Sequence, residues 1–232
     1  MGRFRKNPFH IVNDAVVSGS PVVIKTVNFP REAEEYLTNI LEYFLNKAEL
    51  SHIQDRLGYC LKELISNAVK ANAKRVFFYT KGMNIKNDLD YTEGMSQFRD
   101  EVFNNISYYS EKLRDMGFYV KLYLCKRGNT LQISVRNNSE LMPTEEKRLL
   151  YRIKNAHSYS SMQEAFEEII DYTEGSGLGI VTIILMLKEL GMSEKDLDVR
   201  VENGETYINI FLKTGEVEGV TEEEFVPYAE EA

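Results

Sequence analysis

The sequence predicts an α+β protein, a two-layer sandwich in which a mixed β-sheet carries helices on one face. Two observations carry this prediction. Short runs rich in β-branched and aromatic residues are typical of strands, and longer runs with apolar residues at helical spacing alternate with them. Strands and helices mixed in this order favour one sheet covered by helices. The 232 residues are enough for one large domain, and 43% hydrophobic residues can fill its core.

The N-terminal part of this domain contains one predicted strand and two predicted helices. The strand, residues 22–27, is predicted from its β-branched residues and follows an N-terminal extension of residues 1–21. Pro30 suits the first turn of a helix, which is expected over residues 31–50. A second helix is expected over residues 52–73.

The rest of the domain follows the same two patterns. Residues 83–116 look like a polar insertion with a helix near 96–116, and residues 216–232 form an acidic tail. A tight turn at residues 127–129 is expected to join two strands. The remaining predicted strands are 76–80, 118–125, 130–136, 197–202 and 206–212, and the remaining predicted helices are 144–155, 161–172 and 178–190.

Charge and composition exclude several classes of protein. The formal net charge of −8 argues against a general nucleic-acid binder, because phosphate backbones attract basic surfaces. The only two cysteines, Cys60 and Cys125, form no CxxC pair, which argues against zinc clusters and redox pairs. We expect a cytoplasmic protein, since cysteines are few and no signal peptide is present. No apolar run approaches the roughly 20 residues that span a bilayer, so no membrane helix is expected.

The first informative element is the helix expected over residues 52–73, because three polar residues share one side of it. Glu63, Asn67 and Lys70 follow one another at spacings of four and three, so their side chains point into one space. An amide oxygen suits Mg²⁺, a lysine can pair with phosphate, and a carboxylate can act as a general base. The alternative is an amphipathic helix with a solvated polar face, which is the more common meaning of such a pattern.

The second informative element is the cluster Glu174-Gly175-Ser-Gly177-Leu178-Gly179-Ile, directly before an apolar helix. Glycines let backbone N–H groups approach phosphate, and a helix N-terminus attracts anions. A phosphate-binding turn is therefore expected, and a flexible linker is the alternative. The spacing fits neither a Rossmann fingerprint nor a P-loop, since the final glycine of the first and the Gly-Lys-Ser/Thr of the second are missing.

Together these elements resemble the GHKL superfamily, which contains histidine kinases, gyrase-type ATPases and anti-sigma-factor kinases. Glu63-Leu-Ile-Ser-Asn67-Ala-Val-Lys70 is similar to the N-box of that family, and the glycine cluster is similar to its second glycine box. The resemblance covers about residues 22–212. It implies a Bergerat-type fold over residues 22–215, with an ATP lid over residues 139–173.

The resemblance also implies ligands and roles. ATP and Mg²⁺ would be the cofactors, Asn67 would be the metal ligand, Lys70 would meet phosphate and Glu63 would take the position of the catalytic carboxylate. The expected phosphate contacts at the second glycine box come from Gly175, Gly177, Leu178 and Gly179.

Two positions are expected at the adenine. Asn137 stands where the family has an aspartate that accepts a hydrogen bond from the adenine amino group. An amide oxygen can accept the same bond, but without charge the bond is weaker. Thr206, on a late strand, is expected near the adenine as well. Ser139 and Leu141 replace the glycines of the family's first glycine box.

The resemblance implies a kinase that transfers the γ-phosphoryl group of ATP to a partner protein in two-component or anti-sigma-type signalling. The partner would be a response regulator or a sigma or anti-sigma regulator. None of the three histidines sits in a phosphoacceptor motif, which favours a stand-alone ATP-binding module. The alternative is a degenerate module that regulates a partner by contact, without catalysis. No nucleic acid or membrane partner is expected, and a homodimer is left open.

Overall fold

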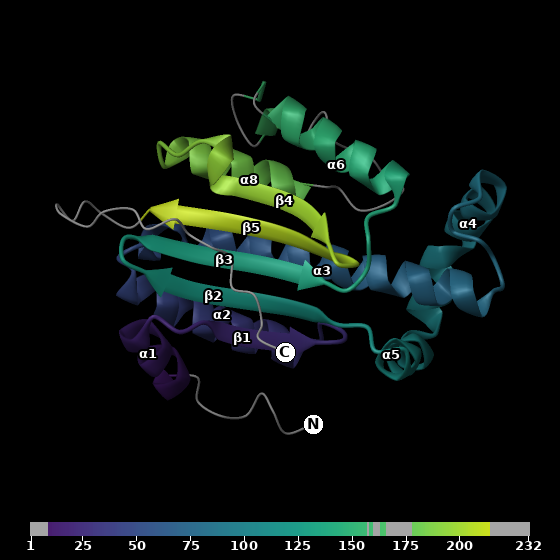
Figure 1. Ribbon diagram of the computed structural model, residues 1–232, viewed down its shortest axis with the longest axis horizontal. Helices are drawn as coiled ribbons and strands as arrows, with labels where there is room; N and C mark the ends of the chain where they lie inside the picture. Colours follow the sequence, from purple (N-terminus) through teal and green to yellow (C-terminus); the bar gives the residue numbers. More distant parts are fainter. Residues whose placement is uncertain (1–8, 157, 160–162, 166–177, 214–232) are drawn as a thin grey trace.

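The computed structural model describes residues 9–156, 158–159, 163–165 and 178–213. Its centre is a five-stranded sheet in the order β1-β2-β3-β5-β4. The strands are β1 (Val22–Thr26), β2 (Val120–Arg127), β3 (Thr130–Asn137), β4 (Leu197–Glu202) and β5 (Glu205–Lys213). The helices are α1 (Phe9–Ser18), α2 (Arg31–Lys47), α3 (Gln54–Thr80), α4 (Asp88–Asn104), α5 (Ile106–Asp115), α6 (Pro143–Ala156) and α8 (Leu178–Glu189) (Figure 1).

The α+β class predicted from the sequence is confirmed, but the prediction of a mixed sheet is wrong. All four strand pairings in the described chain are antiparallel. Two of them are tight hairpins, and Gly128 and Gly204 adopt positive φ angles of 51° and 78° in the turns of these hairpins. The turn expected at residues 127–129 is confirmed as the β2–β3 hairpin.

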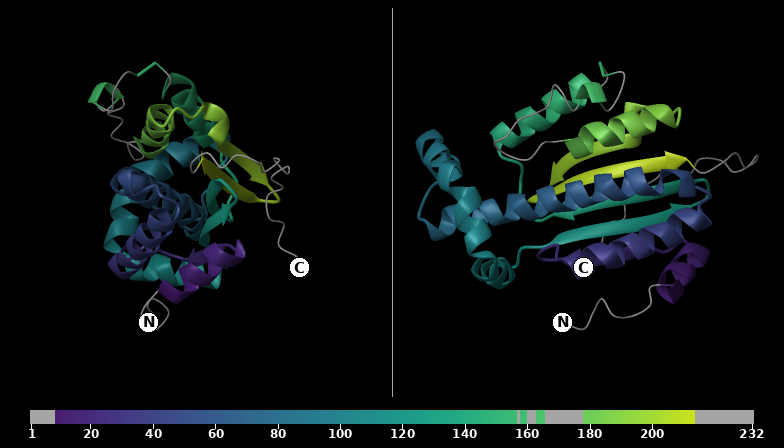
Figure 2. Two further views of the ribbon diagram at one scale, coloured as in Figure 1. Left: turned by 90° about the vertical axis from the view of Figure 1, so that its left-hand side faces the viewer. Right: turned by 180° about the vertical axis from the view of Figure 1, so that it is seen from behind.

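The main core lies between the sheet and a layer formed by α2, α3 and α8. The left view of Figure 2 shows the sheet from its edge, with α2 and α3 gathered on one side of it. Leu61, Ile65 and Ala68 of α3 are buried in this core together with Leu124 and Ile133 of the sheet. The helical periodicity of the apolar residues therefore buries one side of α3 against β2 and β3, as its hydrophobic pattern predicts.

The N-terminal helix α1 belongs to the same core. Val12 is fully buried and Ala15 nearly so, and both join the core cluster of α2 and the sheet. This helix lies within residues 1–21, which the sequence suggested only as an extension. The apolar spacing of so short a segment is a weak signal for a helix, because short helices are marginal alone. Here the helix is stabilised by its packing on α2.

The strand predicted over residues 76–80 is wrong, because α3 continues as a helix to Thr80. Val76, Phe77 and Phe78 are buried there in a second, smaller cluster with Tyr109 and other residues of α4 and α5. The predicted insertion thus forms two helices that pack on the end of α3 (Figure 1). Aromatic and β-branched residues favour strands locally, but burial on a helix face outweighs that preference here.

The predicted lid region begins with α6, which packs on α8 (Figure 1). Most of the helix predicted over residues 161–172 lies outside the described residues. None of the described helices combines the length and apolar composition needed to cross a membrane.

Candidate functional site

The polar stripe of α3 is formed by Glu63, Asn67 and Lys70, as their spacing predicts. Glu63 and Asn67 are half-buried, and Lys70 is exposed. Ile65 lies on the opposite side of the helix, in the main core. The stripe therefore runs along the boundary between the packed side of α3 and the surface of the protein.

These three side chains differ from the other basic side chains of α3. Among the described residues, no ion pair or side-chain hydrogen bond involves Glu63, Asn67 or Lys70. All the other basic side chains of this helix are paired: Arg56 with Glu189, Lys62 with Glu34, and Lys74 and Arg75 with Glu145. The stripe thus holds a carboxylate, an amide and an ammonium group that can bind a ligand without first breaking a contact within the described part of the chain.

The N-terminal end of α8 lies beside this stripe. A Cβ atom added to Gly179 would come within 2.8 Å of the Cβ atom of Glu63 and 3.8 Å of the backbone oxygen of Cys60. The opposite end of α8 is tied to the start of α3 by the ion pair between Glu189 and Arg56. The two helices therefore run antiparallel, and the free N–H groups of the first turn of α8 face the half of α3 that carries the stripe.

Only part of the predicted glycine box belongs to the described chain. Leu178 begins α8, and Gly179 is the second residue of that helix. Gly175 and Gly177 lie outside the described residues, so their expected contact with phosphate stays a prediction. For Gly179 the structure gives a definite local reason for a glycine, because a side chain there would collide with the backbone-proximal atoms of Glu63.

The other predicted site residues meet at one end of the sheet. Asn137 ends β3 and lies directly opposite Thr206 on β5. Both are buried, with exposed fractions of 6% and 5%. Ser139 joins them, since its Oγ accepts a hydrogen bond from Asn137 Nδ2 at 2.7 Å and its backbone oxygen accepts one from the Thr206 hydroxyl at 2.7 Å. This buried group of Asn137, Ser139 and Thr206 is called the polar cluster below.

Helix α3 connects the polar cluster with the stripe. The Asn72 side chain, fully buried, accepts a hydrogen bond from Asn137 Nδ2 at 3.3 Å. Asn72 follows Asn67 by five residues, or about 7.5 Å along a helix axis.

Sequence reasoning missed Asn72, although a signal for it exists. Its position continues the spacing of Leu61, Ile65 and Ala68, which are core residues of α3. An amide at a core position needs hydrogen-bond partners, because an unpaired buried polar group is costly. A polar residue on the apolar side of a predicted helix thus indicates a buried contact, even though its partners cannot be identified from the sequence.

Sequence reasoning also missed the contact between α3 and the start of α6. The Glu145 carboxylate accepts hydrogen bonds from Lys74 Nζ at 3.0 Å and from Arg75 Nη2 at 2.7 Å. Burial alone would raise the pKa of Glu145, but the bonds and charges of Arg75 and Lys74 outweigh it and lower that pKa to about 2. The carboxylate is therefore ionised at neutral pH and fixes the start of α6 on α3.

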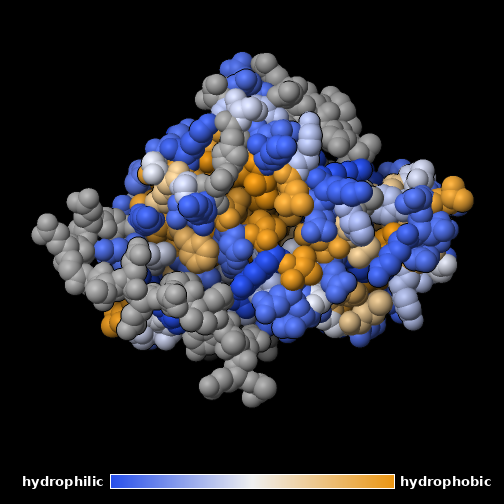
Figure 3. All heavy atoms as spheres, turned by 45° about the horizontal axis from the view of Figure 1, so that its top comes forward, coloured by the Kyte–Doolittle hydropathy of each residue, from blue (hydrophilic) through white to orange (hydrophobic). Residues whose placement is uncertain are grey.

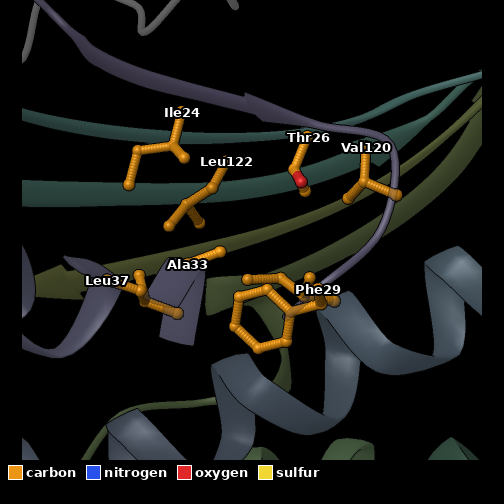
Figure 4. Close-up of a pocket in the computed structure, with 8 residues that line it drawn as sticks. Ile24, Thr26, Phe29, Ala33, Leu37, Val120 and Leu122 are labelled. Atoms are coloured by element: carbon orange, nitrogen blue, oxygen red, sulfur yellow. The ribbon is translucent and has the colours of Figure 1, made fainter. Parts of the chain in front are cut away.

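The structure also contains a small apolar cavity, on the other side of α3. Its lining comes from β1, β2, α2 and Ile65 of α3, and its labelled side chains point toward one another in Figure 4. A cavity of about 10 Å³ has room for roughly one water molecule. It cannot hold a nucleotide, and the polar stripe of α3 does not line it.

Comparison with known proteins adds one relative. No protein-family profile matches the chain, and no solved structure matches it. An uncharacterized protein of Treponema pallidum (strain Nichols) is 36% identical over 195 residues. The match covers 84% of this chain and 38% of that protein, so the chain spans well under half the length of this relative. The resemblance to the GHKL superfamily therefore stays a prediction of the sequence.

Proposed function

We propose that this chain is a GHKL-type domain with a Bergerat-type fold, which binds ATP with Mg²⁺ and transfers the γ-phosphoryl group to a partner protein. The observation that carries the proposal is the contact between Gly179 and Glu63. This contact puts the first turn of α8 beside the unpaired stripe of α3. A phosphate group needs free N–H groups and a cation, and Mg²⁺ needs a hard oxygen ligand. The first turn of α8 offers the N–H groups, and the stripe of α3 offers the cation and the oxygen ligand.

Each residue of the stripe has a role in this proposal. The Asn67 amide oxygen would hold Mg²⁺, and the Lys70 ammonium would bind a phosphate oxygen. The Glu63 carboxylate would orient the attacking group of the partner and accept its proton. Phosphoryl transfer relies mainly on positioning and on neutralising charge, which suits a site that offers one cation, one metal ligand and one base.

The requirement for a partner protein is supported by the surface near α6. In Figure 3 the top of Figure 1 is turned toward the viewer. Hydrophobic side chains gather near the middle of this face, and hydrophilic side chains surround them. Independently of this view, Leu150 and Tyr151 of α6 are 57% and 68% exposed, and Val201 of β4 is 44% exposed. Exposed hydrophobic surface rimmed by polar residues is typical of protein contacts.

The first test is binding of Mg²⁺–ATP by titration calorimetry with the full chain. We expect binding in the wild type and a loss of affinity of about tenfold or more in Asn67→Ala and in Lys70→Ala. Lys62→Ala is the matched control, because Lys62 is on the same helix but is paired with Glu34. Equal affinities for all four proteins would contradict the proposed role of the stripe.

The second test is phosphoryl transfer from labelled ATP to candidate partners. Transfer that Asn67→Ala abolishes would support the kinase. Transfer that persists in this variant would contradict the proposed mechanism, because the metal ligand would then be elsewhere.

A second function is favoured by the neutral Asn137 at the position of the family's aspartate. We infer as the alternative a module that binds nucleotide weakly or not at all and regulates a partner by contact. Loss of the negative charge at this position weakens the expected bond to the base. Absence of binding at millimolar Mg²⁺–ATP in the calorimetry would leave this alternative and exclude the kinase.

A further inference from the structure

One face of the sheet lies opposite the main core. Successive side chains of a strand point to opposite faces, and Leu122 and Val135 are buried in the core. Their neighbours in sequence, Lys121 and Arg136, therefore point to the other face. Figure 1 looks onto this face, because the strands lie in front of α3. It is called the outer face below.

A row of basic residues crosses the outer face. Lys25 of β1 lies opposite Lys121 of β2, and Lys121 lies opposite Arg136 of β3. Beyond them, Tyr207 of β5 lies between Arg136 and Arg200 of β4 in the same register. The basic row thus consists of four cations on one line across the five strands: Lys25, Lys121, Arg136 and Arg200. Like charges directly opposite each other are destabilising, so the row favours an anion above it.

The strands β1, β2 and β3 offer no carboxylate to balance the row, because they contain no aspartate or glutamate. The carboxylates of the outer face lie on β4 and β5 instead. Asp198 and Glu202 form ion pairs with Arg200. The Glu205 carboxylate accepts hydrogen bonds from two tyrosine hydroxyls. An excess of positive charge is therefore left on β1, β2 and β3.

Three neighbours hold the Arg136 guanidinium in place. Its carbon atom lies 4.0 Å from the centre of the Tyr123 ring and 4.8 Å from that of Tyr207, and its Nε donates to Ser134 Oγ at 3.2 Å. Arg136 is only 6% exposed, yet among the described residues no carboxylate forms an ion pair with it. A cation so deeply buried is almost always paired. The arginine is therefore prepared for an anion that the described chain does not supply.

The terminal nitrogens of Arg136 are the atoms left for this anion. They form no hydrogen bond within the described chain, and they are not among its buried polar atoms without a partner, so they reach the surface. A guanidinium binds a carboxylate through two parallel hydrogen bonds, because its planar fork matches the two oxygens. Lys121 and Lys25 extend the same line with two further cations. The outer face thus suits an anion with several carboxylates, such as an acidic peptide segment.

We propose that the acidic tail of this chain, residues 216–232, binds to the outer face, with its glutamates at Arg136 and Lys121. The tail contains seven glutamates and no lysine or arginine, so its charge is opposite to that of the row. It lies outside the described residues and begins three residues after Lys213, the last residue of β5. The proposal does not depend on the proposed function.

The tail is long enough to reach Arg136. Tyr207, which lies opposite Arg136, precedes Lys213 by six residues, or about 20 Å along the strand. Glu222, the first of three consecutive glutamates, follows Lys213 by nine residues, which span up to about 30 Å when extended. A chain that turns back after β5 can therefore place these glutamates over the row. Because the tail is tethered, its effective concentration there is on the order of millimolar.

A single-stranded nucleic acid is the other polyanion that suits basic and aromatic residues on a sheet. Its bases would need free ring faces. The rings of Tyr119, Tyr123 and Tyr207 already carry cations of the row at 4.0 to 5.3 Å from their centres. The formal net charge of −8 also repels a phosphate backbone. Carboxylates of the same chain are therefore the better match.

The test couples lysine amines to carboxylates in the full chain with a water-soluble carbodiimide, which joins only groups in direct contact. Trypsin digestion and mass spectrometry then identify the joined peptides. We expect Lys25 or Lys121 to be joined to glutamates of residues 222–224 within single chains, which are separated from linked dimers by size. At about 0.5 M salt the yield should fall roughly threefold or more, because the contact lies at the surface.

Arg136→Gln tests the central residue of the row, which carbodiimide does not couple. It should lower the yield of coupling at Lys25 and Lys121 roughly threefold or more, because the tail loses its bidentate contact. Arg99→Gln is the matched control, since Arg99 is exposed on α4 and the change in charge is the same. The control should couple like the wild type.

A second variant measures the same contact without a change in the sheet. Glu222→Gln/Glu223→Gln/Glu224→Gln removes three consecutive charges from the tail. A fluorescently labelled peptide of residues 216–232 should bind this variant about tenfold more tightly than the wild type, because the wild-type tail competes for the outer face. Fluorescence anisotropy gives both affinities, and this measurement applies even if Arg136→Gln does not fold.

Four results would each overturn the proposal. Equal coupling yields in Arg136→Gln and Arg99→Gln would show that the row does not bind the tail. Equal affinities of the peptide for the wild type and the tail variant would show that the wild-type tail does not occupy the outer face. Coupling found only in linked dimers would assign the tail to the outer face of a second copy. Tight binding of a single-stranded oligonucleotide that Arg136→Gln weakens and the tail variant leaves unchanged would assign the outer face to nucleic acid.

Discussion

Gly179 of α8 lies directly against Glu63 of α3, closer than any residue with a side chain could. The nearest contact of a Cβ atom at position 179 would be the Cβ of Glu63, at 2.8 Å. The main chain of α3 carries that atom, so it cannot rotate away as the end of a flexible side chain could. Close approach of the two helices thus requires a glycine at this position.

The first prediction is that Gly179→Ala destabilises the protein by about 1–3 kcal/mol, since overpacking forces the two helices apart. The free energy of unfolding is measured by urea denaturation. The matched control is Gly58→Ala on α3, where the added methyl would meet only Leu41 Cδ2 at an ordinary 3.7 Å. Because alanine is the better helix former, the control should be neutral or stabilising by up to about 1 kcal/mol.

The same pair of variants also tests the proposed site. Gly179→Ala should weaken binding of Mg²⁺–ATP because it displaces the first turn of α8 from Glu63, whereas Gly58→Ala should leave binding unchanged. Equal stabilities of the two variants would show that the helices can separate at no cost and that position 179 has no special requirement.

The prediction from sequence succeeded where a local pattern determines the result. The apolar spacing of α3 places Leu61 and Ile65 in the core and Glu63 and Asn67 outside it. In a helix, residues three or four positions apart lie on the same face, so the face of each residue follows from its spacing. The expected strands 118–125 and 130–136 agree with β2 and β3 to within about two residues, the usual uncertainty of such boundaries.

The prediction failed where packing between distant segments determines the result. Residues 76–80 have the composition of a strand, yet Phe77 and Phe78 are buried by α4 and α5, and the helix continues. The reason for a glycine at position 179 also depends on a partner more than 100 residues away. The sequence could place Asn137 and Thr206 near each other only through the family resemblance, since the register of β3 with β5 is not visible in either strand.

A second prediction concerns the contact of Glu145 with Lys74 and Arg75. Glu145→Gln should destabilise the protein by about 3 kcal/mol at pH 7, because it leaves two largely buried cations without a carboxylate. The side chains of Lys74 and Arg75 are only 9% and 12% exposed. Urea denaturation measures the change. Glu35→Gln is the control, since its ion pair with Arg31 is exposed and should contribute less than about 1 kcal/mol.

The pH dependence of this difference follows from the pKa of Glu145, which the folded protein lowers from 4.5 to about 2. The contact therefore contributes its full stability above about pH 4.5, and this contribution is lost as the pH falls toward 2. The stability difference between wild type and Glu145→Gln should shrink over this range. A difference that is constant from pH 7 to pH 2 would contradict the ion pair as its source.

A third prediction concerns the two thiols. Burial raises the pKa of the Cys60 thiol to about 12, with a smaller opposing effect of a backbone hydrogen bond and a further rise from the Glu63 carboxylate. Burial also raises the pKa of Cys125. Because only thiolates react readily, neither cysteine should be alkylated by iodoacetamide at pH 8 in the folded protein, and both should react in urea. Rapid alkylation of the folded chain, followed by mass spectrometry, would contradict the burial of these side chains.

A fourth prediction concerns the second core at the end of α3. A methyl group on Gly94 of α4 would come within 2.5 Å of the Phe78 ring, which is 1% exposed and stacked on Tyr91. Gly94→Ala should therefore loosen α4, α5 and the last turns of α3. The main core, whose cluster contains none of these residues, should keep its stability.

Hydrogen exchange measured by mass spectrometry can separate these two regions. Amides of residues 76–115 should exchange faster in Gly94→Ala, while those of β2 and β3 should be unchanged, because local opening of one unit does not require opening of the whole chain. Glu93→Ala is the control, since Glu93 is the exposed neighbour on the same helix. Faster exchange throughout the sheet would mean that the two clusters unfold together. In that case the α4–α5 unit would be an integral part of the domain and not a separable insertion.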